Sequence, residues 1–135
     1  MADDTSLLLS FYGDDFTGST DAMEALAVSG LRTVLFLAPP SPKFLREKFA
    51  DVRCVGVAGT SRAMSPAEMN EQLAPVLEQL WALGAPITHY KVCSTFDSAP
   101  EVGSIGHVAD LVRGSLAREQ TLTVLAGAPP LRRYT

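Results

Sequence analysis

Five short apolar runs, separated by segments of helical character, constrain the fold of this chain more than any other feature of its sequence. They cover residues 7–12, 33–37, 52–58, 87–92 and 121–126. The second run, Thr-Val-Leu-Phe-Leu, is typical of a strand buried on both faces. Strands that alternate with helices form a mostly parallel sheet. The sequence therefore predicts an α/β fold, a Rossmann-like three-layer sandwich with about five strands and helices on both faces of the sheet.

The segments between these runs carry signals for helices. We expect helices over residues 20–29 and 42–49, between residues 65 and 84, and from residue 103 onward. In the third helix Ser65 is the expected N-cap, proline follows it, and Glu68 closes a capping box. Pro75 predicts a kink or a break in that helix, because proline lacks a backbone N–H. Asp21 and Glu24 have the spacing of an acidic first turn, which favours a structural role for both.

Length and charge limit the class of protein. The 135 residues suffice for a single domain with one core, and the net charge of -4 argues against nucleic acid or an anionic membrane as the main partner. No apolar run reaches the ~20 residues of a membrane span, and the acidic amino terminus lacks the basic start of a secretory signal. We therefore expect a cytoplasmic protein. Cys54 and Cys93 are expected in buried strands as reduced thiols, and no spacing indicates a metal site.

Residues 12–21, Tyr-Gly-Asp-Asp-Phe-Thr-Gly-Ser-Thr-Asp, form the loop after the first predicted strand. Their glycine spacing mimics a phosphate-binding P-loop, but Ser19 stands where the lysine belongs. Asp14 and Asp15 would also repel a triphosphate, so a nucleotide site is a poor interpretation. A carboxylate pair can instead accept hydrogen bonds from hydroxyl groups, hold a cation or take a proton. The structural alternative is that one aspartate caps the helix while the other is solvated.

Further polar side chains follow the other predicted strands. In a parallel sheet these loops meet at one edge, which places Asp14 and Asp15 near Arg62, residues 91–98, and Arg132 with Arg133. The cations suit a carboxylate or phosphate group, and the aspartates with Ser94 and Thr95 suit alcohols. The expected ligand is small, with one anionic group and several hydroxyls.

The remaining candidates at this edge have competing interpretations. A lysine at position 91, at the end of an apolar strand, indicates a functional role. Asp97 either binds ligand or braces its loop, and the second role is slightly favoured. Gly103, Ser104 and Gly106 precede a predicted helix, where backbone N–H groups hold an anion or the glycines only make a tight turn. Cys93 lacks a nearby histidine to activate it as a nucleophile.

Taken together, these segments resemble the amino-terminal domain of the four-carbon acid sugar kinases. The matching pieces are Gly-Asp-Asp-Phe-Thr-Gly-Ser-Thr-Asp at 13–21, Thr-Ser-Arg at 60–62, Lys-Val-Cys-Ser-Thr-Phe-Asp-Ser at 91–98, Gly-Ser-Ile-Gly at 103–106 and the tail at 128–135. The family usually has asparagine as the second residue of the fourth piece. The resemblance covers essentially the whole chain, and the third piece is specific because no common motif shares it.

The resemblance implies a two-domain, ATP-dependent kinase that phosphorylates threonate, erythronate or a 3-oxo-tetronate on its terminal hydroxyl. It implies that the amino-terminal domain holds the sugar acid, with contacts from Asp14, Arg62, Lys91, Ser94 and Thr95, while Asp14 or Asp15 orients or deprotonates the hydroxyl. ATP and Mg²⁺ belong to a nucleotide-binding domain that this chain lacks. We therefore expect this chain to be the front part of the substrate domain and to have no kinase activity alone. If the chain exposes a sheet edge, we expect it to pair with another copy.

Two other functions compete with this hypothesis. The first is a stand-alone module that binds or senses a hydroxy acid without catalysis. The second is a phosphoryl-accepting receiver domain, suggested by the acidic pair and a later lysine. The receiver hypothesis fails because the third predicted strand runs into Ala-Gly-Thr-Ser at 58–61, with no aspartate to phosphorylate.

Overall fold

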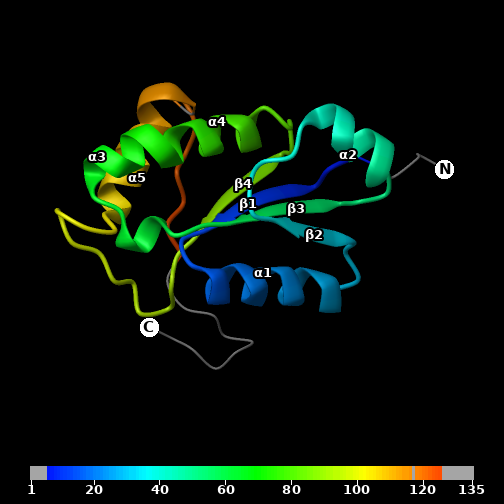
Figure 1. Cartoon of the computed structure of the whole chain (residues 1–135), viewed down its shortest axis with the longest axis horizontal. Coiled ribbons are helices and arrows are strands. Elements are labelled where there is room, and N and C mark those ends of the chain that lie inside the picture. The colour runs from blue at the N-terminus through cyan, green and yellow to red at the C-terminus, as the bar shows by residue number, and fades with distance from the viewer. Residues whose placement is uncertain (1–5, 117, 126–135) are drawn as a thin grey trace.

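The computed structural model describes residues 6–116 and 118–125, and these form an α/β fold around a parallel sheet (Figure 1). The strands are β1 (Leu9–Gly13), β2 (Thr33–Phe36), β3 (Cys54–Ala58) and β4 (Ile87–Lys91). Their order in the sheet is β2-β3-β1-β4, and every pair is parallel. The predicted α/β class with a parallel sheet is thus confirmed.

Helices cover both faces of the sheet. They are α1 (Phe16–Val28), α2 (Pro42–Lys48), the short 3₁₀ helix η1 (Ser61–Ala63), α3 (Pro66–Glu68), the π-helix η2 (Met69–Leu73), α4 (Ala74–Trp81) and α5 (Ile105–Ser115). In Figure 1, α1 lies alone on one face, and α2 and α4 lie on the other, with α3 and α5 beside α4. This is the expected arrangement of three layers.

The connections explain this distribution and define the binding edge. The connection from β1 to β2 crosses the sheet in one direction, and the connections from β2 to β3 and from β3 to β4 run in the opposite direction. Because crossovers between parallel strands are right-handed, α1 lies on one face of the sheet and the later helices lie on the other. The chain leaving β1 therefore turns away from the chains that leave its neighbours, β3 and β4. Such a switch point is where open α/β sheets bind ligands.

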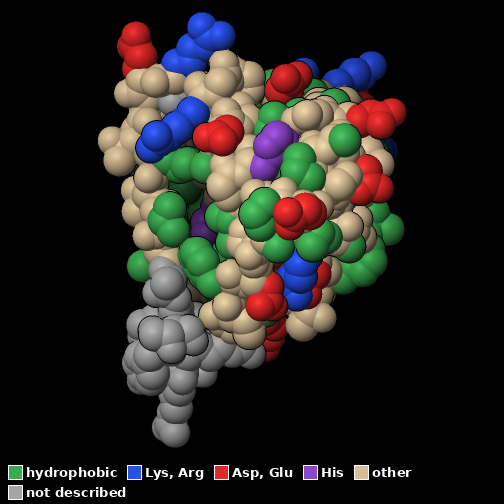
Figure 2. Space-filling model, turned by 90° about the vertical axis from the view of Figure 1, so that its left-hand side faces the viewer, with side chains coloured by type: hydrophobic (Ala, Val, Ile, Leu, Met, Phe, Trp, Pro, Cys, Tyr) green, Lys and Arg blue, Asp and Glu red, His purple; other side chains and the backbone are tan. Residues whose placement is uncertain are grey.

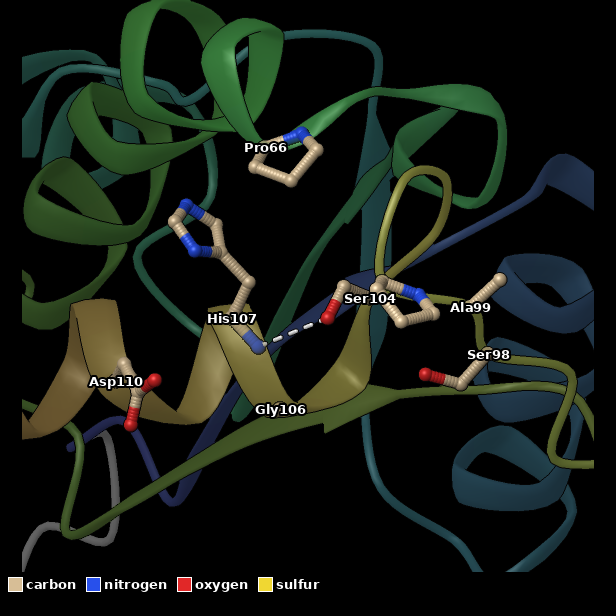
Figure 3. Close-up of a pocket in the computed structure, with 8 residues that line it drawn as sticks. Pro66, Ser98, Ala99, Ser104, Gly106, His107 and Asp110 are labelled. Atoms are coloured by element: carbon tan, nitrogen blue, oxygen red, sulfur yellow. Dashed lines mark hydrogen bonds between the residues drawn. The ribbon is translucent and has the colours of Figure 1, made fainter.

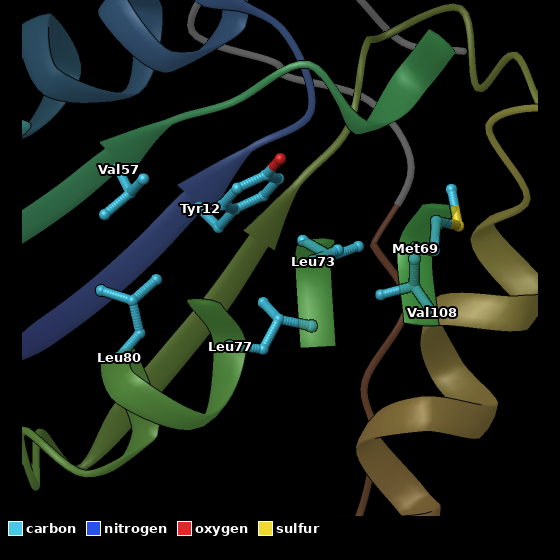
Figure 4. Close-up of a cluster of buried hydrophobic side chains, with 7 residues drawn as sticks. All are labelled: Tyr12, Val57, Met69, Leu73, Leu77, Leu80 and Val108. Carbon is cyan, nitrogen blue, oxygen red and sulfur yellow. The ribbon is translucent and has the colours of Figure 1, made fainter. Parts of the chain in front are cut away.

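The main core lies between the sheet and the helices that follow β3. Its buried side chains are Tyr12, Val57, Met69, Leu73, Leu77, Leu80 and Val108 (Figure 4). Four of them come from one face of the η2–α4 segment, as the spacing of its apolar residues predicts. Figure 4 shows that they point toward the sheet residues Tyr12 and Val57 and toward Val108 of α5. A smaller cluster is formed by Leu45 of α2, by Val52 and by Val55 of β3.

The predicted break near Pro75 takes the form of a π-helix. Ser65 and Glu68 form the expected capping box at the start of α3, and the helical chain then widens into η2 before Pro75 enters α4. Because Pro75 has no N–H, the preceding turn cannot keep its regular hydrogen bonds. The segment therefore stays helical throughout but changes its register at the proline.

Four predictions about individual elements were wrong. Residues 121–125 are not a strand, and residue 126 lies outside the described residues, so the described sheet has four strands. β2 is half-buried because it is an edge strand. Helix α1 begins at Phe16, which puts Asp21 and Glu24 beyond its first turn. Cys93 lies in the half-buried loop after β4, whereas Cys54 is buried in β3 as expected. Within the described residues, no helix has the length and apolar character required to span a bilayer.

Candidate functional site

Asp15 closes the turn between β1 and α1. It is the N-cap of α1, and its Oδ1 accepts a hydrogen bond of 2.7 Å from the backbone N–H of Gly18. The hydroxyl of Ser19 donates to the carbonyl of Asp15 at 2.5 Å. Gly13 makes room for this arrangement, since a Cβ there would lie 1.9 Å from Oγ of Ser19. The loop that mimics a P-loop is therefore a tightly packed capping turn, with one of the predicted aspartates as its cap.

Asp14 joins the ends of three elements through its backbone. Its N–H donates to the carbonyl of Lys91 at 2.9 Å, and its carbonyl accepts from the N–H of Arg62 at 3.1 Å. Asp14 itself is 4% exposed. The carboxyl ends of β1 and β4 and helix η1 thus converge, and Asp14, Asp15, Arg62 and Lys91, hereafter the charged cluster, lie together as the parallel sheet predicts.

All three guanidinium nitrogens of Arg62 face carboxylate oxygens. Nη2 and Nε donate to the two oxygens of Asp14 at 3.0 and 3.3 Å, and Nη1 lies 3.0 Å from Oδ2 of Asp15. The hydrogen bond with Asp14 is the main cause of the raised pKa of Arg62, opposed by burial and supported by the charges of both aspartates. Arg62 therefore holds both carboxylates in place with a two-pronged contact that lysine cannot make.

Lys91 lies on the other side of the Asp15 turn. Its Nζ donates to the carbonyl of Val92 at 2.6 Å, and the side chain is half-buried. A Cβ on Gly18 would lie 2.8 Å from Oδ1 of Asp15 and 3.5 Å from Nζ of Lys91, so both charged groups approach the bare backbone of this glycine. Among the described residues, no carboxylate lies within ion-pair distance of the Lys91 ammonium.

The loop after β4 carries the other predicted ligand contacts. Ser94 is half-buried in a turn, and the Thr95 hydroxyl donates to Oδ2 of Asp97 at 2.8 Å. Phe96 takes a positive φ of 56°, which is uncommon for a residue with a side chain. Hydrogen bonds with Thr95 lower the pKa of Cys93, and the Arg62 charge contributes to this. Asp97 thus braces the loop through a hydroxyl, rather than through the backbone N–H groups that the sequence suggested.

The predicted anion-binding turn has part of its donor set engaged. Ser104 caps α5 by accepting from the N–H of His107 at 3.1 Å, and the Ser98 hydroxyl accepts from the N–H of Ile105 at 3.0 Å. Gly103 has a φ of +60°, and a Cβ there would lie 2.4 Å from the carbonyl oxygen of Arg62. The turn therefore packs directly against the charged cluster, while only part of its backbone N–H set is available to a ligand.

A cavity of about 450 Å³ opens beside this turn (Figure 3). It is lined by Pro66, Ser98, Ala99, Pro100, Ser104, Gly106, His107 and Asp110. None of the charged cluster lines it. The cavity therefore offers serine hydroxyl groups, the His107 ring and the Asp110 carboxylate, whereas the charged cluster lies in the adjoining turn.

Two positioning residues escaped the sequence analysis. A hydrogen bond of 2.6 Å joins the hydroxyls of Ser61 and Tyr90, the residues that precede Arg62 and Lys91. The Tyr90 ring also stacks on Tyr12, with centroids 5.6 Å apart. These contacts fix the ends of β1 and β4 and the start of η1 relative to one another. The sequence signal that could have identified Ser61 and Tyr90 is that each directly precedes a predicted cation. Arg132 and Arg133, also predicted at this edge, lie outside the described residues.

The surface around the binding edge has mixed charge. Figure 2, which faces the side of the molecule where α3 and α5 lie, shows acidic, basic and hydrophobic side chains interspersed. Among the described side chains on this face there is no continuous basic patch of the kind that tracks a nucleic-acid backbone. A parallel α/β sheet with two carboxylates, a guanidinium and an ammonium at its switch point belongs to the class of domains that bind small polar ligands at the sheet edge.

Comparison with known proteins gives the family. The family model described as a sugar-binding N-terminal domain matches residues 9–135, and the chain belongs to this family. The 3-oxo-isoapionate kinase of Paraburkholderia graminis is 56% identical over 128 residues, which cover 95% of this chain and 27% of that kinase. The 3-oxo-tetronate kinase of Burkholderia multivorans is 39% identical over 103 residues, or 76% of this chain and 23% of that kinase. The resemblance to the sugar-acid kinases is thus confirmed.

A solved structure agrees with the fold. A crystal structure from Salmonella typhimurium LT2, described as that of a tRNA synthase, matches with a TM-score of 0.69 and 31% identity. The match covers 82% of this chain and 25% of that one. This chain therefore spans about a quarter of the length of the relatives it matches.

Proposed function

We propose that this chain is the part of an ATP-dependent kinase that holds a four-carbon sugar acid, namely threonate, erythronate or a 3-oxo-tetronate, for phosphorylation of its terminal hydroxyl. The observation that carries the proposal is the convergence of Asp14, Asp15, Arg62 and Lys91 at the switch point of the sheet. Membership of a sugar-binding family and the names of the related kinases support it. The 56% identical relative adds 3-oxo-isoapionate as a further candidate substrate.

In this proposal the two halves of the ligand meet different groups. A cation of the charged cluster matches its carboxylate, and the carboxylates of Asp14 or Asp15 match its hydroxyls as hydrogen-bond acceptors or as the base. Ser94 and Thr95 supply further hydroxyl contacts, with Asp97 holding Thr95. Ser104 and Gly106 offer the remaining backbone donors at the start of α5, because the N–H of Gly103 already donates to the carbonyl of Met64 at 2.8 Å.

The described residues do not fit ATP or Mg²⁺. The P-loop lysine is replaced by Ser19, whose hydroxyl is engaged by the Asp15 carbonyl. Both aspartates contact Arg62, and no group of three His, Cys, Asp or Glu side chains that could hold a metal occurs within the described residues. We therefore assign ATP and Mg²⁺ to the part of the kinase outside this chain. Pairing of two copies through the edges of the four-stranded sheet, at β2 or β4, is a further element of the proposal.

Isothermal titration of the purified chain with D-threonate, D-erythronate, 3-oxo-isoapionate and ATP tests this function. We expect a sugar acid to bind and ATP not to bind, and we expect Arg62→Ala and Lys91→Ala each to weaken sugar-acid binding by about tenfold or more. Lys43→Ala is the matched control, because it removes an exposed cation from α2, outside the charged cluster. Binding of ATP without any sugar acid contradicts the proposal. Sugar-acid binding without phosphate transfer, even when the nucleotide-binding part of a related kinase is supplied with ATP and Mg²⁺, favours the stand-alone binding module instead.

A further inference from the structure

We infer that Lys91 selects the anionic group of the ligand, whereas Arg62 is a positioning residue that holds the two aspartates; this assignment rests on the proposed function. The sequence treats these two cations as equivalent, because each follows a strand and each suits a carboxylate. The structure separates them by their contacts. One cation is already surrounded by carboxylates and the other is not.

Arg62 has little capacity left for a ligand anion. Its Nε and Nη2 donate to both oxygens of Asp14, and its Nη1 faces Asp15. The Asp14 side chain is only 6% exposed. If Arg62 turned toward a ligand, it would leave this buried carboxylate without its charged partner, which is strongly unfavourable. The guanidinium therefore stays with the aspartates and keeps their oxygens in a fixed orientation toward the hydroxyl groups of the ligand.

Lys91 has the opposite character. Its half-buried ammonium has three donors, and residues 6–116 and 118–125 give it one acceptor, the neutral carbonyl of Val92. Oδ1 of Asp15 approaches the same glycine, Gly18, but lies beyond ion-pair distance of Nζ. A partly buried ammonium gains from an anionic partner, and a ligand carboxylate beside Gly18 would supply one. The first turn of α1 begins at this point, and its helix dipole also favours a negative charge.

The roles assigned to Lys91 and Arg62 predict different changes in affinity for charged and for neutral ligands. The test measures the affinity of the chain for D-threonate and for D-threitol, the neutral polyol of the same length, by isothermal titration. We expect the unsubstituted chain to prefer D-threonate. Lys91→Met should lower that preference on the order of 10- to 100-fold, since it removes charge-assisted hydrogen bonds to the carboxylate alone. Lys43→Met, on the surface of α2, should leave the preference unchanged.

Arg62→Lys separates positioning from selection. This variant keeps the positive charge but loses the two-pronged contact with Asp14, so we expect weaker binding of both ligands in similar proportion and an unchanged preference. The assignment is overturned if Lys91→Met keeps the preference, if Arg62→Lys abolishes it, or if the unsubstituted chain binds both ligands equally. If the unsubstituted chain binds neither ligand nor any other sugar acid, the proposed function itself fails, and the assignment fails with it.

Discussion

Gly18 is the residue on which the charged groups of the site depend most closely. A helical glycine usually destabilises a helix relative to alanine. At this position, however, a Cβ would lie 2.8 Å from Oδ1 of Asp15 and 3.5 Å from Nζ of Lys91. The absence of a side chain lets the capping carboxylate and the ammonium both reach the first turn of α1.

We expect Gly18→Ala to weaken the cap and bring no gain in stability, while Gly114→Ala stabilises the chain by about 0.5–1 kcal/mol. Gly114 is the matched control, since it is exposed in α5 and an added Cβ meets no atom within 4 Å. Urea denaturation of the three proteins measures the difference. A stabilisation by Gly18→Ala equal to that of Gly114→Ala would show that the Asp15 cap tolerates a methyl group.

At the scale of residues, the sequence predicted which groups meet but not how they pair. Asp14, Arg62 and Lys91 each lie within a few residues of a strand end, and a parallel sheet necessarily brings such positions to one edge. The contact of one arginine with two carboxylates depends on the depth and rotamer of each side chain, which no spacing encodes. The open alternative, that one aspartate caps the helix while the other is solvated, is confirmed for Asp15 as the cap but is wrong for Asp14, which is buried against Arg62.

At the scale of elements, the hydrogen bond between Ser61 and Tyr90 connects helix η1 to β4. Burial is the main cause of the raised pKa of Tyr90, opposed by its hydrogen bond with Ser61. A raised pKa means that the folded chain keeps this proton at a pH where the unfolded chain has lost it. The stabilising contribution is therefore complete below the ordinary tyrosine pKa of about 10 and is lost as the pH rises above it.

We expect Tyr90→Phe to lower the stability at neutral pH by about 1–3 kcal/mol, because the buried Ser61 hydroxyl loses its partner. The same variant should flatten the decline in stability above pH 10, by up to about 1.4 kcal/mol per pH unit, because it carries no titrating hydroxyl. Urea denaturation at several pH values between about 8 and 11 measures both effects. Equal slopes for the two proteins above pH 10 would contradict the assignment of this titration to Tyr90.

The elements themselves were predictable where local and long-range signals agreed. Each of β1 to β4 coincides with an apolar run, and the capping box begins α3 as expected. The run at 121–125 has strand propensity, yet it forms no strand, and Val124 and Leu125 are 66% and 78% exposed. A strand exists only where another strand pairs with it, and propensity cannot provide that pairing. The predicted start of α1 was too late in the sequence, because Gly18 is a poor helix former and lies in the first turn of the helix.

At the scale of the whole molecule, the chain matches about a quarter of each related kinase. Phosphoryl transfer depends on positioning both reactants and on neutralising charge, and the proposed function assigns only one reactant to this chain. We expect the purified chain to transfer no phosphate from ATP to D-threonate, D-erythronate or 3-oxo-isoapionate. An assay that couples ADP release to a spectroscopic signal, with a known sugar kinase added as the positive control, measures this. Turnover by the chain at an ordinary enzymatic rate would refute the division of roles between its parts.

The order of the strands in the sheet also has a consequence for folding during synthesis. Of the four described strands, β1 leaves the ribosome before the others and lies in the interior of the sheet, and neither of its partners, β3 and β4, has been made at that time. Its apolar residues must wait on the order of seconds at ordinary rates of synthesis. During that interval an exposed apolar segment is prone to aggregation, which is the condition that chaperones relieve. The charged cluster joins residues as distant as 14, 62 and 91, so it cannot form before residue 91 has been synthesised.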